Sequence, residues 1–125
     1  MKNIFLGTRI LLGLIFFVFG LNFFLNFIPT PPPDETMKKM MEGIMAMGYL
    51  LPVVKTLEVI SGLFLLIGIF VPLILLILAP IVVNIAIIHF VYAPAGAVMA
   101  IALIALMLVQ AYAYKERFLP LLKIK

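Results

Sequence analysis

Cysteine is absent from this chain of 125 residues. Without a thiol, the sequence excludes disulfides, thiolate catalysis, iron–sulfur clusters held by cysteine and covalently attached c-type haem. Charge is also scarce, at 11% of residues, whereas 66% of residues are hydrophobic and the mean hydropathy is +1.34. A water-soluble domain of this size does not have so apolar a composition, so we predict an integral membrane protein.

The few charges are mostly positive, with nine Lys and Arg against five Asp and Glu, a net charge of +4. We attribute the excess to residues that flank membrane spans and face anionic lipid headgroups, and we expect no nucleic-acid partner. The first apolar run follows Lys2 and Arg9 and reaches Ile28. It is longer than the apolar part of a signal peptide and no small-residue cleavage site follows it, so we predict a retained anchor.

Four apolar segments each approach the ~20 residues needed to cross a bilayer. The connections after the second and third segments are so short that consecutive helices must run antiparallel and pack as neighbours. The predicted fold is therefore an all-α membrane protein, a four-helix antiparallel bundle in a single domain over residues 1–125. The predicted spans are residues 4–28, 52–70, 73–92 and 96–114.

An even number of crossings places both chain ends on one side of the membrane. Most basic residues lie near those ends: Lys2, Arg9, Lys115, Arg117, Lys123 and Lys125. Because basic flanks favour the cytoplasmic side, we predict that both termini are cytoplasmic.

The one long connection contains methionines at helical spacing. A stiff Pro-rich stretch leads to Asp34, which can cap a helix, and the following apolar positions recur every three or four residues. This pattern predicts an amphipathic helix at about residues 35–47, lying in the outer interface as a lid over the bundle. The proposed lid residues are Met37, Met40, Met41 and Met45.

Polar side chains inside the spans gather toward the outer side. Counted from the outer end of each helix, Asn22, Glu58 and Asn84 lie about 9 to 12 Å deep, and Asn26, Lys55 and His89 lie about 3 to 5 Å deep. The inner half has little polarity beyond a few edge residues: Thr8, Arg9 and Gln110. The sequence therefore predicts one outer polar pocket.

Glu58 is the leading functional candidate. An isolated charge in the middle of a span costs about 2.5 to 3.5 kcal/mol, so Glu58 must be paired with Lys55, hydrogen-bonded or protonated. Intramembrane carboxylates usually serve a pathway or a proton relay, although a structural role in holding helices together is the alternative. The asparagines divide evenly between ligand binding and helix packing.

Metal binding is the less favoured interpretation of the remaining residues. His89 is a single histidine near a helix end, more typical of a hydrogen-bonded side chain than of a metal or haem ligand. The methionine spacings are those of packing residues more often than of a copper site. We expect no metal and no intrinsic cofactor.

Several motifs resemble the DoxX and DoxX-like membrane proteins. They are GLN at residues 20–22, E-x-x-x-G at 58–62, G-x-F-V-P at 68–72 and AP-x-x-x-N-x-x-x-x-H at 79–89. The resemblance implies a four-helix prokaryotic protein of the cytoplasmic membrane, in a family with some members linked to quinone reduction or to redox protein partners. It also implies that Asn22, Glu58, Asn84 and His89 occupy recurrent polar positions.

Three functions follow as hypotheses, and whether the chain is an enzyme stays open. In the first, the protein is a redox-linked subunit whose pocket binds a quinone or similar small polar ligand, with Glu58 as the catalytic proton carrier. The ligand-binding residues would be Asn22, Asn26, Lys55, Asn84 and His89. In the second, it is a small proton-coupled transporter. In the third, it is a non-catalytic anchor or assembly partner. A homo-oligomer is compatible with each.

Overall fold

The computed structural model describes residues 2–29 and 34–123, and these residues are helical apart from short turns and ends. In chain order the elements are α1 (Lys2–Leu25), α2 (Glu35–Met45), α3 (Leu50–Ile67), α4 (Val71–Tyr92), the 3-10 turn η1 (Pro94–Gly96), α5 (Ala97–Ala113), α6 (Lys115–Phe118) and the 3-10 turn η2 (Leu119–Leu122). The predicted all-α fold is confirmed.

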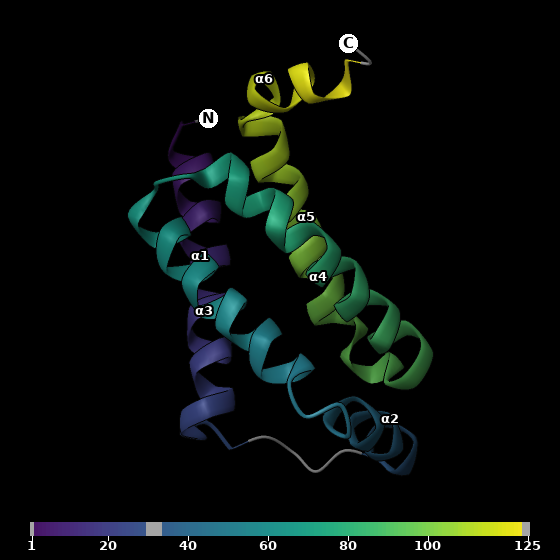
Figure 1. Ribbon diagram of the computed structural model, residues 1–125. Coiled ribbons are helices and arrows are strands. Elements are labelled where there is room, and N and C mark those ends of the chain that lie inside the picture. Colours follow the sequence, from purple (N-terminus) through teal and green to yellow (C-terminus); the bar gives the residue numbers. More distant parts are fainter. Residues whose placement is uncertain (1, 30–33, 124–125) are drawn as a thin grey trace.

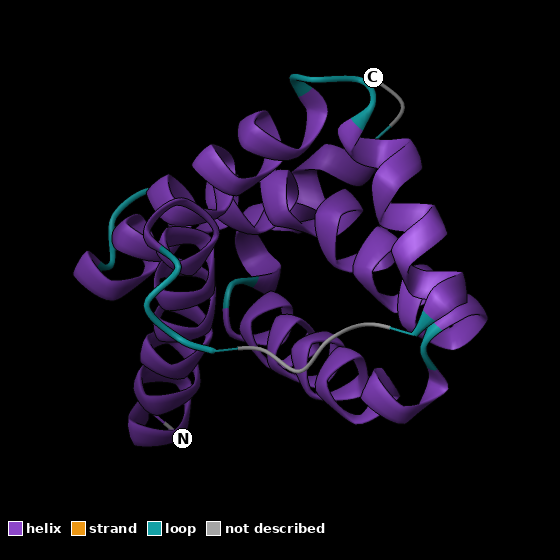
Figure 2. Ribbon diagram, turned by 90° about the horizontal axis from the view of Figure 1, so that it is seen from below, coloured by secondary structure: helices purple, strands orange, loops and turns teal. Residues whose placement is uncertain are grey.

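Four helical segments are long and apolar enough to cross a membrane, as predicted: α1, α3, α4 and the segment Pro94–Ala113 that contains α5. Each of these helices packs against the next, and α5 packs back against α1, so the four close into a ring. Seen from below, the helices accordingly surround a common centre (Figure 2). Both termini lie at one end of this bundle, here called the termini end, and α2 lies at the other, here called the α2 end (Figure 1).

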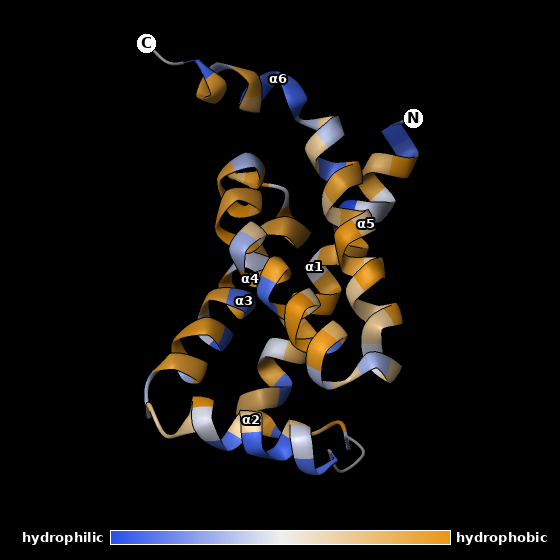
Figure 3. Cartoon of the chain, turned by 90° about the vertical axis from the view of Figure 1, so that its right-hand side faces the viewer, coloured by the Kyte–Doolittle hydropathy of each residue, from blue (hydrophilic) through white to orange (hydrophobic). Residues whose placement is uncertain are grey.

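The distribution of apolar side chains is that of a lipid-facing bundle. The centre contains Leu12, Leu65 and Leu78, each fully buried. Large apolar side chains also face outward from every span, including Leu14 and Val83. Hydrophobic residues dominate the middle of the bundle, whereas hydrophilic residues gather on α2 and around the termini (Figure 3). An apolar outer face of this kind requires lipid rather than water around it.

Glycines bring α1 and α3 into close contact. A Cβ placed on Gly62 would lie 2.5 Å from the backbone nitrogen of Phe17 and 2.7 Å from the carbonyl oxygen of Gly13. A side chain at residue 62 would therefore push the two backbones apart. Small residues at a crossing allow two membrane helices to approach this closely.

Two spans end earlier than the hydropathy pattern suggests, because left-handed residues stop them. The first helix ends at Leu25 rather than Ile28, since Asn26 adopts φ 53° and its N–H donates to the Asn22 carbonyl at 2.7 Å. The third helix ends at Ile67 rather than at residue 70, since Gly68 adopts φ 88°. Asn and Gly are the residues that most readily take this conformation at a helix end.

The other boundaries differ by one or two residues. The helix α4 begins at Val71 rather than residue 73, and α5 covers 97–113 rather than 96–114 because the turn η1 precedes it. The helix α2 ends at Met45 rather than residue 47, and Asp34 caps its start by accepting from the Met37 N–H at 2.8 Å. The location of α2 in a membrane interface stays a prediction. The sequence did not predict α6 and η2.

Candidate functional site

Glu58 is buried and ion-paired. It lies in α3 with 3% of its surface exposed, and one helical turn earlier Lys55 places its Nζ 3.0 Å from Glu58 Oε2. The Lys55 side chain is 26% exposed, so its ammonium keeps partial contact with the surroundings while neutralising the carboxylate. This arrangement satisfies the requirement that a carboxylate within a span be paired.

The Lys55–Glu58 pair lines a cavity of about 420 Å³ at the α2 end, here called the α2-end cavity. Two polar side chains of α4, Asn84 and His89, line the same space. The remaining walls are largely aliphatic side chains of α3 and α4, and α2 contributes three more residues: Met37, Met41 and Ile44. The cavity thus combines an apolar lining with four polar groups from two helices, a composition typical of small-molecule sites.

Asn84 is held by its own helix. Its amide Nδ2 donates to the Pro80 carbonyl oxygen at 2.9 Å. One N–H of the amide is used in this bond, and the second N–H and the amide oxygen are available to other groups. Although residues 84 and 89 differ by about 140° around a regular helix, both side chains reach the same cavity.

His89 is oriented from two sides. Its Nδ1 lies 2.8 Å from the Ile85 carbonyl oxygen, and its ring lies so close to Gly96 that a Cβ there would be 2.6 Å from Cδ2. A carbonyl oxygen only accepts hydrogen bonds, so Nδ1 carries the proton and Nε2 is the nitrogen left for a ligand.

A second, smaller cavity adjoins the first. It measures about 160 Å³ and shares Lys55, Glu58 and Ile85 with the α2-end cavity. Its other walls come from α1 and α5 and are apolar, including Phe16 and Leu103. The Glu58 carboxylate therefore lies between two cavities, one beneath α2 and one within the bundle.

Asn22 and Asn26 lie away from the α2-end cavity. The Asn22 Oδ1 accepts from the Ile28 N–H at 2.7 Å, and its Nδ2 donates to the Ile28 carbonyl at 3.3 Å. Asn26 is exposed and forms the left-handed end of α1. Both side chains therefore have a local structural explanation, the termination of α1 and the turn after it.

The four methionines of α2 also divide. Met37 and Met41 line the α2-end cavity, whereas Met40 lies beside Tyr92 on a neighbouring surface and Met45 is 57% exposed. Only one edge of α2 therefore covers the cavity.

The termini end contains polar contacts between helices, although the sequence indicates little polarity in this half of the bundle. Gln110 is fully buried in α5, and its Nε2 donates to the Phe5 carbonyl at 2.9 Å and to Thr8 Oγ1 at 2.6 Å. A glutamine inside an otherwise apolar span is the sequence signal that marks this contact. Across the described ranges 2–29 and 34–123, no three or more His, Asp or Glu side chains gather where they could share a metal ion.

The family comparison covers the helices that form the α2-end cavity. The model of the DoxX family matches residues 4–93, from α1 through the end of α4, and this range contains Lys55, Glu58, Asn84 and His89. No curated protein and no solved structure gives a significant match. The chain is therefore a member of the DoxX family of membrane proteins.

Proposed function

We propose that this protein binds the headgroup of a quinone, or of a chemically similar small molecule, in the α2-end cavity and works as a redox-linked membrane subunit. The observation that supports the proposal is the position of four polar side chains, from α3 and α4, around one largely aliphatic space. A quinone has the matching chemistry, because it combines two carbonyl acceptors with an apolar ring and tail.

Three polar side chains of the cavity can donate hydrogen bonds to that ligand. The Lys55 ammonium and the second N–H of the Asn84 amide are donors for carbonyl oxygens, and His89 Nε2 is a donor when the ring is charged. The aliphatic walls provide the apolar contact that the ring and tail need. The residues present therefore fit a quinone headgroup.

Glu58 and His89 serve as proton carriers in this proposal. Reduction of a quinone to a quinol consumes two electrons and two protons, and in this proposal a redox partner protein supplies the electrons. Glu58 holds a proton or a charge beside Lys55, and His89 exchanges protons through Nε2 at the α2 side. The other lining residues position the ligand.

The orientation that accompanies this proposal places the α2 end on the outer side of a prokaryotic cytoplasmic membrane. The supporting observation is the distribution of cations. The basic side chains at the termini end are Lys2, Arg9, Lys115, Arg117 and Lys123, and basic flanks favour the cytoplasm. In this orientation, Met37 and Met41 cover the cavity from outside.

Equilibrium binding of a short-chain ubiquinone to protein in lipid nanodiscs tests the proposal. We expect Glu58→Gln to weaken binding about tenfold or more, because the Glu58 carboxylate holds the Lys55 ammonium in the cavity, and a hydrogen bond from this charged donor to a quinone carbonyl contributes about 1.5 to 3 kcal/mol. Glu42→Gln is the matched control, since it makes the same chemical change on the exposed face of α2. Unaltered affinity in folded Glu58→Gln protein contradicts the proposal.

Proton-coupled transport is the second candidate, favoured by the position of Glu58 between two cavities. It requires a path to the termini end past the fully buried Leu12, Leu65 and Leu78. Proton flux into liposomes that disappears in Glu58→Gln but not in Glu42→Gln would support transport. If Glu58→Gln instead changes only folding stability or partner association, the protein is a non-catalytic anchor.

A further inference from the structure

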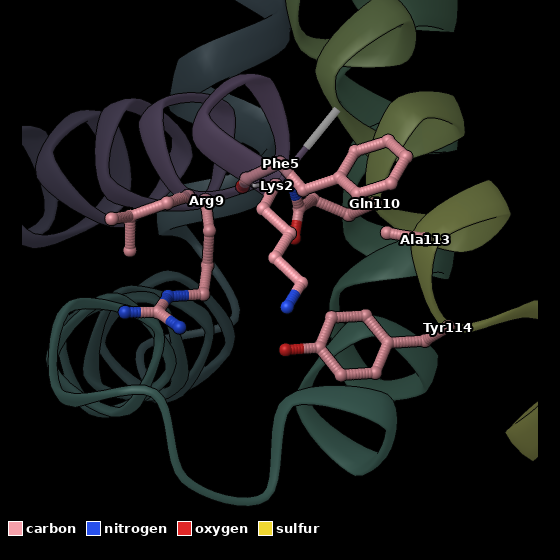
Figure 4. Close-up of a pocket in the computed structure, with 7 residues that line it drawn as sticks. Lys2, Phe5, Arg9, Gln110, Ala113 and Tyr114 are labelled. Atoms are coloured by element: carbon pink, nitrogen blue, oxygen red, sulfur yellow. Dashed lines mark hydrogen bonds between the residues drawn. The ribbon is translucent and has the colours of Figure 1, made fainter.

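The termini end contains a third cavity, of about 320 Å³, here called the termini-end cavity. Its polar lining groups are Lys2 and Arg9 from α1, Gln110 from α5 and Tyr114 directly after α5. Figure 4 shows the Lys2 ammonium and the Tyr114 hydroxyl pointing toward one another, with the Arg9 guanidinium to one side. Of these four residues, Arg9 lies within the range that the family model matches, and Lys2, Gln110 and Tyr114 lie outside it.

Gln110 lines this cavity and carries an unsatisfied acceptor. Its Nε2 uses its hydrogens on Phe5 and Thr8, and its Oε1 is buried without a hydrogen-bond partner, on a residue that is 0% exposed. Buried carbonyl oxygens normally have a partner, because leaving one without costs about 1 to 3 kcal/mol. A ligand that brings a hydroxyl donor would supply it.

Positive charge at the same cavity has no acidic counterpart. None of its described lining residues is Asp or Glu, and the one ion pair found over residues 2–29 and 34–123 is Lys55–Glu58, near the α2 end. Arg9 Nε is buried without a hydrogen-bond partner, and the guanidinium packs against Gly68. The cavity therefore offers two cations and one acceptor, which an anion that also has a hydroxyl group would complement.

We propose that the termini-end cavity binds a glycerol phosphate group, with the phosphate between Lys2 and Arg9 and a glycerol hydroxyl donating to Gln110 Oε1. The group has two sources, the headgroup of phosphatidylglycerol and free glycerol phosphate. Apolar surface next to the cations favours the lipid, since Leu6 lines the cavity and is 47% exposed where an acyl chain would run. Binding of this kind ties α1 to α5 through the ligand.

Lipid retention measured by native mass spectrometry tests the charged half of the site. Protein is extracted from mixed phosphatidylglycerol and phosphatidylcholine vesicles, and the bound lipids are counted. We expect retention of phosphatidylglycerol to fall about tenfold in Lys2→Gln and not in the control, because only Lys2 is proposed to donate a charge-assisted hydrogen bond to the phosphate. Lys115→Gln is the matched control, because it removes the same charge at the same end from an exposed side chain outside the cavity.

Phosphatidylethanol tests the proposed contact between a glycerol hydroxyl and Gln110. This lipid has the same phosphodiester charge but lacks the glycerol hydroxyls of the headgroup. We expect wild-type protein to retain phosphatidylglycerol in preference to phosphatidylethanol, and Gln110→Leu to remove that preference while the protein still melts cooperatively. Displacement of bound lipid by free glycerol 1-phosphate would identify the soluble compound as a competing source. Equal loss in Lys2→Gln and Lys115→Gln, or no preference between the two anionic lipids, overturns the proposal.

Discussion

The two ends of the bundle satisfy their polar side chains in opposite ways. At the α2 end, Asn84 and His89 bond to carbonyl oxygens four residues earlier in their own helix, at Pro80 and Ile85. At the termini end, Gln110 bonds across from α5 to two groups of α1. The same residue class therefore reinforces one helix at one end and connects two helices at the other.

This difference separates side chains that hold helices together from side chains available to a ligand. A polar group bonded to its own helix adds no bond between helices, so it can turn toward a ligand without loosening the bundle. A polar group that bridges two helices contributes directly to their association, because lipid offers no competing hydrogen bonds. At the α2 end the side chains of Asn84 and His89 are thus suited to binding, whereas at the termini end the Gln110 Nε2 connects two helices and only Oε1 is left for a ligand.

At each end of the bundle, a basic side chain also packs against a glycine. Arg9 lies over Gly68, in the turn after α3, and His89 lies over Gly96, in the turn before α5. Gly68 has φ 88°, so its backbone favours glycine, and a Cβ there would also displace the Arg9 guanidinium. Gly96 has φ −91°, which any residue adopts, so a Cβ there would only displace the His89 ring. The contact at the termini end is therefore the more strictly determined of the two.

The largest difference in stability between the two ends should appear when Gln110 and Asn84 are each replaced by alanine. We expect Gln110→Ala to lower the free energy of unfolding by about 2 to 4 kcal/mol, since it deletes a fully buried side chain and two bonds between helices. Asn84→Ala should change it by less than about 0.5 kcal/mol, because Asn84 is exposed to the cavity and bonds only within α4. Equilibrium unfolding in mixed micelles measures both.

Gln110→Leu separates the hydrogen bonds from the packing in that result. Leucine keeps most of the side-chain volume and removes the unpartnered Oε1 together with the two bonds. We expect it to cost less than Gln110→Ala. Equal destabilisation by Gln110→Ala and Asn84→Ala would show that the two ends do not differ as described.

A smaller effect should follow from Gly68→Ala at the termini end. The new Cβ would lie 2.8 Å from an Arg9 guanidinium nitrogen and would force alanine into a left-handed conformation. The conformational cost alone is about 1 to 2 kcal/mol, so the melting temperature should fall. Gly7→Ala is the control, since nothing lies within 4 Å of its Cβ position and alanine favours the helix α1. A melting temperature unchanged by Gly68→Ala contradicts this prediction.

The fold was predictable from sequence because hydropathy alone specifies it. Four apolar runs, the last three of them joined by short connections, allow few arrangements other than an antiparallel bundle. The helix ends were less predictable, because hydropathy continues through Asn26 and Gly68 while the backbone stops there. Local left-handed conformations, rather than the loss of apolar residues, set these ends.

For the candidate site, the sequence gives the level of a polar side chain along its helix but not its direction around the helix axis. Counting residues from a helix end gives the depth of a side chain in the membrane, and it placed Asn22, Glu58 and Asn84 in one layer. It does not give the direction around the helix, and it does not show that Asn22 bonds to the turn after α1. Gln110 was undervalued for the same reason, because its partners come from a helix distant in sequence.

The smallest effect on stability, and the most informative for the α2 end, should come from Gly96→Ala. The added methyl group would meet His89 Cδ2 at 2.6 Å and turn the ring away, breaking the bond between Nδ1 and the Ile85 carbonyl. Because the displaced side chain lies at the α2 end and bonds only within α4, the free energy of unfolding should change by less than about 1 kcal/mol.

The ring of His89 can be observed by NMR. The chain has a single histidine, so its imidazole resonances report this ring alone. We expect the Nδ1 resonance to lose its hydrogen-bonded shift in Gly96→Ala and to keep it in Gly43→Ala, whose Cβ position is open. If the ring is unaffected while stability falls sharply, then His89 is not free to turn and the α2 end is as tightly cross-linked as the other.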